Sequence, residues 1–468
     1  MIRIMKLYRL AATALICMLG AKQTLAQQTD YSHYYIDTPV SLAQPALPSI
    51  PSLTVSITDF GAKGDGLTLN TSAFENAVRQ LAEQGGGCLT VPAGVWLTGP
   101  IELKSNVRLH LDRQAILYFS PDKSLYLVPK GKSSRVYPCI RADKAHDIAI
   151  TGEGIIDGNG AQWRPVKRSK VSKIEWDDYM ELGGIEKQNG TLWYPWEMKS
   201  GYKDIASTPE AQEKMRNDLI RITNSQRIMV KGVTVQNSPK FHVHPLNCSD
   251  VIIDGITVRC PWNAQNGDAI DLSDCHRCLI VNSTVDAGDD GLCMKSGISK
   301  SSNLVNGCKD ILIQANTVYH AHGGFVIGSE SISGLDRIVV RQCRFAGTDT
   351  GLRFKSGIGR GGKTSNIYIS DIMMTDIKDE AVVFQCDYVN RPAGSSGEKE
   401  AQAESEIPEF ADIHISNVIC RTADRAVSAH GISGHRCVYG ITIDRCAFSD
   451  IRKDNDIDAS TTEISIRP

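Results

Sequence analysis

The stretch VIIDGITV at 251–258 decides the fold, because close variants of it recur along the chain. CLIVNSTV follows at 278–285 and ILIQANTV at 311–318. Each begins with three or four apolar residues, continues through two or three residues that are mostly polar or small, and ends in Thr-Val. Five further segments of this kind begin at Ile228, Ile338, Ile367, Ile413 and Ile441. Consecutive segments begin 23 to 46 residues apart, so the pattern is an internal repeat.

A repeat of this length, with alternating Ile and Val, is typical of a parallel β-helix. The same position of every coil then faces one narrow core, and Asn, Asp and Gly make the turns. The segments VRLHLDRQAIL from Val107 and IAITGEGIIDG from Ile148 fit the first coils. We therefore predict an all-β solenoid with a single-stranded parallel β-helix fold.

The stretch NTSAFENAVRQLAEQGGG at 70–87 predicts the one clear helix. Asn70 or Thr71 is the expected N-cap, and Gly85 ends the helix. Its apolar face consists of Phe74, Ala77, Val78 and Leu81. We expect this helix to cap the N-terminal end of the β-helix, where unpaired strand edges would otherwise invite aggregation.

Residues 1–26 are predicted to be an export signal peptide. Basic residues precede the apolar run 10–20, and Ala26 offers a cleavage point. The exported protein would lie in the periplasm or outside the cell; a lipid anchor at Cys17 is the less favoured alternative. The apolar run is too short to span a bilayer, and no comparable run follows, so we expect no stable membrane insertion.

Charge and cysteine content restrict the class of protein further. Removing residues 1–26 takes away four basic and no acidic residues, which changes the formal net charge from −2 to −6. Bulk charge therefore gives no reason to expect nucleic-acid binding. Thirteen cysteines remain, an odd number, so at least one is predicted to lack an intramolecular disulfide. Cys275 and Cys278 form a lone C-x-x-C, which we interpret as buried or disulfide-bonded cysteine rather than a metal site.

Residues 27–468 are predicted to form a single β-helix domain with insertions at about 162–218 and 388–410. The second insertion is polar and suggests a solvated loop. The first holds seven aromatic residues: Trp163, Trp176, Trp193, Trp196, Tyr179, Tyr194 and Tyr202. They either form a small cluster that fixes the loop or a wall that stacks sugars or closes one end of a cleft.

Charged residues recur at the same spacing as the coils. Asp268 and Asp289 are 21 residues apart, His322 follows 33 residues later, and Arg353 lies another 31 residues on. These residues, with Asp290 beside Asp289, should therefore line one face. Carboxylates held close together split their proton affinities, as acid-catalysed hydrolysis of a polysaccharide requires. Taken singly, an Asp-Asp pair beside glycine is more often a turn or a calcium ligand.

The motifs NGD at 266–268, GDD at 288–290, HGG at 322–324 and RFK at 353–355 occur in an order that resembles the polygalacturonase family, glycoside hydrolase family 28. Its signatures are usually written N-T-D, D-D, G-H-G and R-I-K. GEGIIDGNG at 152–160 and DFGAKGDG at 59–66 resemble its N-terminal region. The family's fold, a right-handed parallel β-helix of the pectin-lyase-like type, agrees with the repeat.

The resemblance implies inverting hydrolysis and assigns the site residues. Asp289 would be the general acid, and Asp268 with Asp290 would hold and activate water. His322 would orient the acid. Substrate binding would involve Asn266, Arg353 and Lys355. The last two would hold a galacturonate carboxylate by charge-assisted hydrogen bonds.

The expected activity is cleavage of α-1,4-linked galacturonic acid bonds in pectin, with attack at chain ends favoured by the aromatic insertion. Gly267, Ala321 and Phe354 depart from the family motifs without removing a titrating group, which leaves the exact pectic substrate open. The alternatives are a rhamnogalacturonan hydrolase, a calcium-dependent pectate lyase and a non-catalytic polysaccharide-binding β-helix. We expect a pectic substrate, no cofactor, no metal and a monomer.

Overall fold

The computed structural model describes residues 30–129, 136–187, 190–195, 215–297, 307–388 and 407–468. The contact pattern divides the chain into Met1–Asp37 and Thr38–Pro468. The first unit contains the short 3-10 helix η1 (Ser32–Tyr35). The predicted signal peptide and most of the predicted 388–410 insertion lie outside the described residues. In the part that is described, no helix is both long and apolar enough to cross a membrane.

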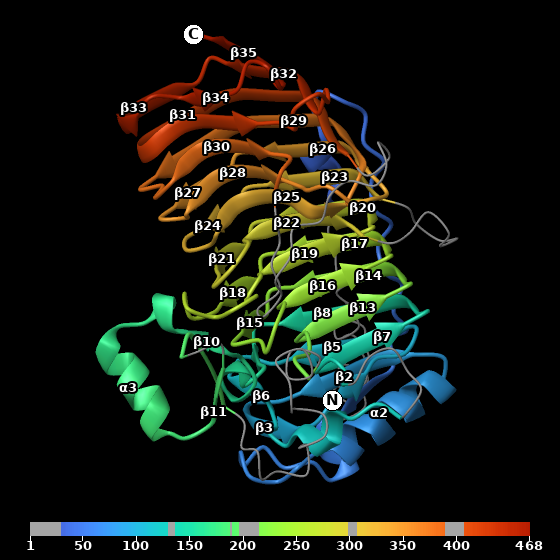
Figure 1. Cartoon of the computed structure of the whole chain (residues 1–468). Coiled ribbons are helices and arrows are strands. Elements are labelled where there is room, and N and C mark those ends of the chain that lie inside the picture. Colours follow the sequence, from blue (N-terminus) through green and yellow to red (C-terminus); the bar gives the residue numbers. More distant parts are fainter. Residues whose placement is uncertain (1–29, 130–135, 188–189, 196–214, 298–306, 389–406) are drawn as a thin grey trace, which may run out of the picture. The chain divides into compact units, whose positions relative to one another are not determined.

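The second unit is a parallel β-helix whose coils each contribute strands to three stacks (Figure 1). We call the stack that carries the predicted catalytic residues the site stack. Its strands are β4 (Ile101–Glu102), β7 (Ile140–Asp143), β13 (Ile220–Thr223), β16 (Val243–Leu246), β19 (Ile270–Ser273), β22 (Leu292–Ser296), β25 (Gly323–Ser331), β28 (Thr350–Lys355), β30 (Glu380–Gln385), the last part of β31 (Pro408–His430) and β34 (Asp456–Ile457).

The second stack holds most of the repeated segments seen in the sequence. Its strands are β1 (Thr54–Ser56), β2 (Gly87–Val91), β5 (Val107–Leu111), β8 (His146–Gly152), β14 (Gln226–Lys231), β17 (Ser249–Asp254), β20 (His276–Val281), β23 (Cys308–Gln314), β26 (Leu335–Arg341), β29 (Gly362–Thr375), the first part of β31, β32 (Val438–Asp444) and β35 (Thr462–Arg467). Every pairing in it is parallel.

The third stack has the shortest strands. They are β3 (Gly94–Thr98), β6 (Ala115–Phe119), β9 (Ile155–Asp157), β15 (Thr234–Gln236), β18 (Thr257–Arg259), β21 (Thr284–Asp286), β24 (Thr317–Val318) and β27 (Arg344–Ala346), followed by the end of β29, the middle of β31 and β33 (Ala447–Lys453). The fold class predicted from the repeat is therefore confirmed.

The repeat also predicted the register of the second stack. Ile228 pairs with Val251, Val251 with Cys278, and Cys278 with Ile311. The pairing continues through the first residue of each later segment: Ile338, Ile367, Ile413 and Ile441. All eight side chains are buried, so this column of apolar residues forms part of the core.

Helix α2 (Thr71–Glu83) forms where the sequence predicted it and packs on β2, β4 and β5 of the first coils. All four predicted face residues are buried, and Gly85 adopts φ 89° just beyond the helix. The expected capping hydrogen bond is absent: Asn70 is the N-cap by position, but its side chain makes no cap bond. It instead joins Lys63 to Leu97, which ties two early segments together.

The first insertion folds as a small separate layer. It contains η4 (Gly160–Gln162), β10 (Val166–Lys167), η5 (Arg168–Lys170), α3 (Lys173–Glu181), β11 (Ile185–Lys187) and β12 (Leu192–Tyr194). Three short strands pair antiparallel, and α3 lies away from the stacked coils (Figure 1). The sequence did not predict α3, because Trp176 is its one buried residue and no apolar stripe marks it.

Cysteine is a core residue in this fold. All thirteen cysteines in the described residues are unbridged, and all but Cys446 are buried. Cys275 and Cys278 are both fully buried, which confirms the interpretation of that pair as core residues. Two remaining short helices, η2 (Ile57–Phe60) and η3 (Lys123–Tyr126), complete the described elements.

Candidate active site

The predicted catalytic residues gather on adjacent coils of the site stack. Asp268 lies two residues before β19, and Asp290 lies two residues before β22. His322 directly precedes β25, and its backbone N–H donates to the carbonyl of Asp289 at 2.8 Å. Arg353 and Lys355 lie on β28, two coils beyond Asp290. The coil spacing in the sequence therefore correctly predicted a common face.

Gly288, at the turn before Asp289, permits this turn to approach the backbone of another loop closely. A Cβ on Gly288 would lie 2.6 Å from the carbonyl oxygens of Pro261 and Ala264. Any larger residue before Asp289 would therefore push the turn away from the 260–267 loop that leads to Asp268. The glycine of the GDD motif is therefore needed for close packing against this loop as well as for the turn.

Asp268 shares a buried lysine with Asp271. Lys295 Nζ donates to Asp268 Oδ2 at 2.9 Å and also to Asp271 Oδ1. Burial raises the pKa of Asp268 well above its usual range; Lys295 opposes this, and the charge of Asp271 adds to it. The other oxygen of each carboxylate, Asp268 Oδ1 and Asp271 Oδ2, is buried without a hydrogen-bond partner. These two atoms can carry the protons that the raised pKa values of both carboxyl groups favour.

Asp289 is held by His322, which is held in turn by a lysine from the first insertion. His322 Nδ1 lies 2.9 Å from Asp289 Oδ1, and Lys170 Nζ donates to His322 Nε2 at 2.9 Å. Because Nε2 accepts this bond, Nδ1 carries the ring proton and donates it to the carboxylate. Lys170 also donates to the carbonyl of Gly288 at 3.2 Å.

These contacts favour the ionised form of Asp289 in the free site. Burial alone would raise its pKa, yet the hydrogen bond from His322 and the charges of Lys355 and Lys170 bring that pKa below its usual range. The free site therefore places a proton more readily on Asp268 than on Asp289. The predicted general acid must gain its proton through a change that substrate binding brings.

Asp290 lies between the catalytic turn and the two cations of β28. Lys355 Nζ donates to Asp290 Oδ2 at 2.7 Å, and Arg353 Nη1 lies 3.8 Å from Asp290 Oδ1. Despite burial, Lys355 and Arg353 lower the pKa of Asp290, against the charge of Asp289. Both cations also face the ring of Tyr388, at 5.4 Å for Lys355 Nζ and 5.7 Å for the Arg353 guanidinium carbon.

Asn266 lies beside the site, but its side-chain oxygen is already hydrogen-bonded to another residue. Its Oδ1 accepts a hydrogen bond from Arg216 Nη2 at 2.8 Å, and Arg216 Nη1 donates to the carbonyl of Gln265 at 2.7 Å. Asn266 has φ 52°, a left-handed conformation that asparagine tolerates well. Its substrate-binding role stays a prediction.

Asp289, Asp290 and His322 bring ligand-type atoms within 4.8 Å of one another, a grouping that could hold a metal ion. Two of the three already have cationic partners: Lys355 binds Asp290 and Lys170 binds His322. The surrounding positive charge suits stabilised carboxylates better than it suits a divalent cation.

The aromatic residues of the first insertion are packing residues. Trp163 and Tyr194 belong to the main core, where Trp163 contacts Tyr126 edge-on at 5.0 Å. Trp176 and Trp193 form a satellite cluster with Val166, and Tyr179 packs against it. These five rings therefore do not form the sugar-stacking wall that was one of the two predictions; Trp196 and Tyr202 lie outside the described residues.

Three residues of this site were not assigned from the sequence. Asp271 follows the NGD motif by three residues and Lys295 follows the GDD motif by five, so coil spacing could have identified them. Lys170 carried no signal, because its contact with His322 spans 152 positions and begins in an irregular segment.

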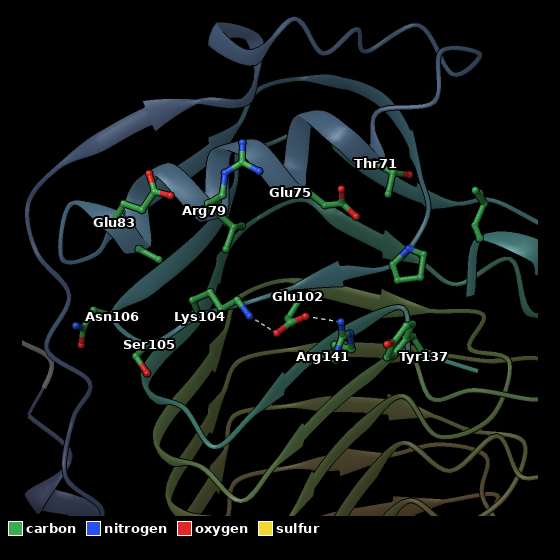
Figure 2. Close-up of a pocket in the computed structure, with 14 residues that line it drawn as sticks. Thr71, Glu75, Arg79, Glu83, Glu102, Lys104, Ser105, Asn106, Tyr137 and Arg141 are labelled. Atoms are coloured by element: carbon green, nitrogen blue, oxygen red, sulfur yellow. Dashed lines mark hydrogen bonds and ion pairs between the residues drawn. The ribbon is translucent and has the colours of Figure 1, made fainter. Parts of the chain in front are cut away.

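A further cavity of about 780 Å³ lies between α2 and the first coils (Figure 2). Thr71, Glu75, Arg79 and Glu83 of α2 face it, and Glu102 of β4 forms ion pairs with Lys104 and Arg141 below the helix. This cavity belongs to the N-terminal coils and shares no residue with the predicted catalytic group.

Comparison with known proteins gives consistent matches over most of the chain. The family model described as "Glycosyl hydrolases family 28" matches residues 183–463. A "Probable polygalacturonase" of Vitis vinifera is 30% identical over 69% of this chain and 61% of its own length. An "Exo-poly-alpha-D-galacturonosidase" of Dickeya chrysanthemi is 26% identical over 84% of this chain and 66% of its own. The chain thus spans less than two thirds of the length of these relatives.

Among solved structures, a hyperthermoactive exopolygalacturonase from Thermotoga maritima matches with a TM-score of 0.69 and 25% identity, covering 90% of this chain and 94% of that chain. The polygalacturonase from Erwinia carotovora matches with a TM-score of 0.65 and 21% identity, covering 91% of this chain and 99% of that chain, which supports the fold.

Proposed function

The chain belongs to glycosyl hydrolases family 28, and we propose that it hydrolyses α-1,4-linked galacturonic acid bonds in pectin as an inverting polygalacturonase. The observation that carries this proposal is the grouping of Asp268, Asp289 and Asp290 on adjacent coils, next to Arg353 and Lys355. Three carboxylates with different proton affinities supply the acid and base, and two cations suit a uronate carboxylate.

In this proposal Asp289 protonates the glycosidic oxygen while Asp268 and Asp290 bind and deprotonate a water on the opposite face of the sugar. Inverting enzymes separate acid and base by about 6.5–9.5 Å to leave room for that water. A substrate carboxylate bound by Arg353 and Lys355 would partly neutralise Lys355, which is one of the cations that lower the pKa of Asp289. Substrate binding would therefore help to protonate the general acid.

We further propose that attack occurs at chain ends. Two of the matched relatives, from Dickeya chrysanthemi and Thermotoga maritima, are named for exo-action. The first insertion also reaches the catalytic turn directly, since Lys170 contacts both Gly288 and His322. An insertion at this position limits the space for a polymer that continues past the cleaved bond.

The pectate lyase alternative would use the carboxylates as calcium ligands. Asp268 and Asp290 each accept a hydrogen bond from a buried lysine, which competes with that role. The non-catalytic alternative gives no reason for buried, oppositely shifted carboxylates at one turn. Hydrolysis accounts for both observations.

Export and a monomeric state belong to the same proposal. Residues 1–26 have the composition of a signal peptide, with basic residues before the apolar run 10–20. N-terminal sequencing of the protein recovered from the periplasm or medium should begin after Ala26. Light scattering after size exclusion should give the mass of one chain.

The activity is tested by incubating the purified protein, with a chelator present, on polygalacturonic acid and on oligogalacturonides. Free galacturonate should appear from the outset, and Asp289→Asn should abolish its release. A ladder of oligomers would instead mean internal cleavage. An unsaturated, ultraviolet-absorbing product that depends on calcium would establish the lyase, and full activity in Asp289→Asn would overturn the catalytic assignment.

A further inference from the structure

The face of the site stack has opposite excess charge on the two sides of the predicted catalytic residues, toward the C-terminal and toward the N-terminal coils. Toward the C-terminal coils, a cleft of about 580 Å³ extends from His322 over β28 and β30. Its charged lining residues other than histidine are Arg353, Asp349, Asp379, Glu380 and Asp387. We call this the acidic arm. Four carboxylates and one guanidinium make it negative.

Toward the N-terminal coils, a cleft of about 500 Å³ extends over β7 and β13. Its charged lining residues are Arg141, Arg216, Arg221, Lys240, Asp143 and Asp218. We call this the basic arm. It adjoins the catalytic group, because the ring of Phe241 faces Lys240 at 5.3 Å and the catalytic Lys295 at 4.2 Å.

Most of the charge in the acidic arm is not neutralised by neighbours. Lys378 Nζ donates to Asp349 Oδ1 at 2.8 Å. Within the described part of the chain, Asp379, Glu380 and Asp387 form no ion pair. Burial and the charge of Asp349 raise the pKa of Asp379, against Lys378. Burial and the charge of Asp379 raise the pKa of Glu380, against a backbone hydrogen bond and the charge of Arg425.

This charge distribution conflicts with a long run of galacturonate. Every free galacturonate carries a carboxylate, and the acidic arm has one arginine for such a group, at its catalytic end. A second carboxylate farther along the arm would lie among Asp379, Glu380 and Asp387, where like charges repel. In the basic arm, by contrast, four cations outnumber two carboxylates, which favours a uronate carboxylate even though Arg141 pairs with Glu102 and Arg221 with Asp218.

We propose that the acidic arm selects an uncharged sugar next to the single uronate held at Arg353 and Lys355. This inference rests on the proposed hydrolysis and specifies its substrate. The substrate would be a pectic chain whose free uronates bind the basic arm, and the sugar that follows in the acidic arm would have no charge. Such a unit is either a methyl-esterified galacturonate or a neutral sugar that alternates with galacturonate, as in rhamnogalacturonan.

The test compares kcat/KM on pentagalacturonate with kcat/KM on partly methyl-esterified oligogalacturonides of the same length. The wild-type protein should prefer the esterified oligomers or be inhibited by oligosaccharides of alternating galacturonate and rhamnose. The first result identifies the ester as the uncharged unit, and the second identifies the neutral sugar. Activity on free pentagalacturonate with neither effect would overturn the inference.

The variant Asp379→Asn/Glu380→Gln should improve use of free pentagalacturonate by about three- to tenfold, since it removes two carboxylates that repel the substrate carboxylate. The gain should come through a lower KM with kcat little changed. Asp379 is exposed and Glu380 is half-buried, so folding should survive; thermal unfolding checks this, and the single variant Asp379→Asn repeats the test with less disturbance.

Asp450→Asn is the matched control, because Asp450 is exposed, lies outside the arm and has φ 54°, which asparagine accepts. It should leave kcat/KM on both substrates unchanged. An equal gain in this control, or no gain in the double variant, would contradict the selective role of the acidic arm. Failure of the wild-type protein to hydrolyse any galacturonide would instead contradict the proposed function.

Discussion

At the residue scale, the site combines, on adjacent coils, carboxyl groups whose pKa values are shifted in opposite directions. Asp268 is pushed toward its protonated form by burial and like charge, and Asp289 is held ionised by His322 and the neighbouring lysines. The two carboxyl groups differ because Asp268 shares Lys295 with Asp271, whereas Asp289 contacts His322, whose Nε2 also lies 3.8 Å from Asp349 Oδ2. In the free site these shifts run opposite to the proposed roles, so the proposed mechanism requires Asp289 to gain a proton and Asp268 to lose one when substrate binds.

The variant Lys170→Met tests whether the insertion tunes the general acid. Lys170 is one of the cations that lower the pKa of Asp289, so its loss should raise that pKa. If Asp289 must be protonated to act, the basic limb of the kcat/KM profile reports this pKa and should move to higher pH. The measurement is a pH profile of galacturonate release.

Lys173→Met, in the same insertion, provides the control, since Lys173 is exposed and pairs with Asp177 rather than with the catalytic turn. Its profile should match the wild type. A basic limb that stays in place in Lys170→Met would show that the insertion contacts the site without affecting the acid.

The six charged residues predicted from the motifs all meet on the site stack, but their partners could be predicted only in part. Coil spacing relates residues at equivalent turns, so it could reveal Asp268, Asp290 and Arg353. It gives no information about Lys170, whose position depends on how an irregular insertion folds back. The sequence also offered no means to see that Asn266 is held by Arg216.

At the element scale, each strand depends on the column of apolar residues that it shares with its neighbours. Ile338 is fully buried and pairs with Ile311 on one side and Ile367 on the other. Ile338→Ala should lower the free energy of unfolding by about 2–5 kcal/mol, since truncating a buried isoleucine loses contacts and leaves a cavity. Denaturant unfolding measures the change.

Ile419→Ala is the corresponding control, because the side chain of Ile419 is 49% exposed on β31. Its effect should stay within about 0.5 kcal/mol, as for most surface substitutions. Equal losses at both positions would mean that strand propensity, not burial in the shared column, determines stability.

A second column joins the coils by ion pairs. Arg227 binds both oxygens of Asp147, Arg277 those of Asp250, and Arg337 those of Asp310. All six residues adopt positive φ. The pairs therefore link successive coils near the first residues of the second-stack strands.

Asp147 makes this column sensitive to acid. The hydrogen bond from Arg227 lowers the pKa of this carboxyl in the folded protein, against burial. A lowered folded-state pKa stabilises the fold above the unfolded-state pKa of about 3.9, and this contribution is lost as pH falls through the folded value. Asp147→Asn should therefore lower the urea midpoint at pH 7 and make it less dependent on pH below about 4 than in the wild type.

Asp450→Asn again serves as the comparison, since Asp450 is exposed and belongs to no such pair among the described residues. It should keep the pH dependence of the wild type. If Asp147→Asn shows the same loss of stability between pH 4 and pH 2 as the wild type, the ion pair does not contribute to acid unfolding.

At the scale of the whole molecule, the Thr38–Pro468 unit was predictable because its core is periodic. The repeat determines strand class, register and the face that carries the charged turns. The first insertion was not predictable in the same way: β10, β12 and α3 contribute residues to a small cluster beside the main core, and no period marks them. Periodic sequence therefore encodes the scaffold, and aperiodic sequence encodes what modifies the site.

The placement of Asp268, Asp290 and Arg353 on separate hydrogen-bonded coils has an evolutionary consequence. Neighbouring strands in a sheet lie about 4.8 Å apart, so the backbone itself sets how far apart these groups stand. The segments between coils can lengthen, shorten or be replaced without altering that distance. Descendants of such a chain can acquire new substrates through mutations in their loops while inheriting the catalytic geometry unchanged.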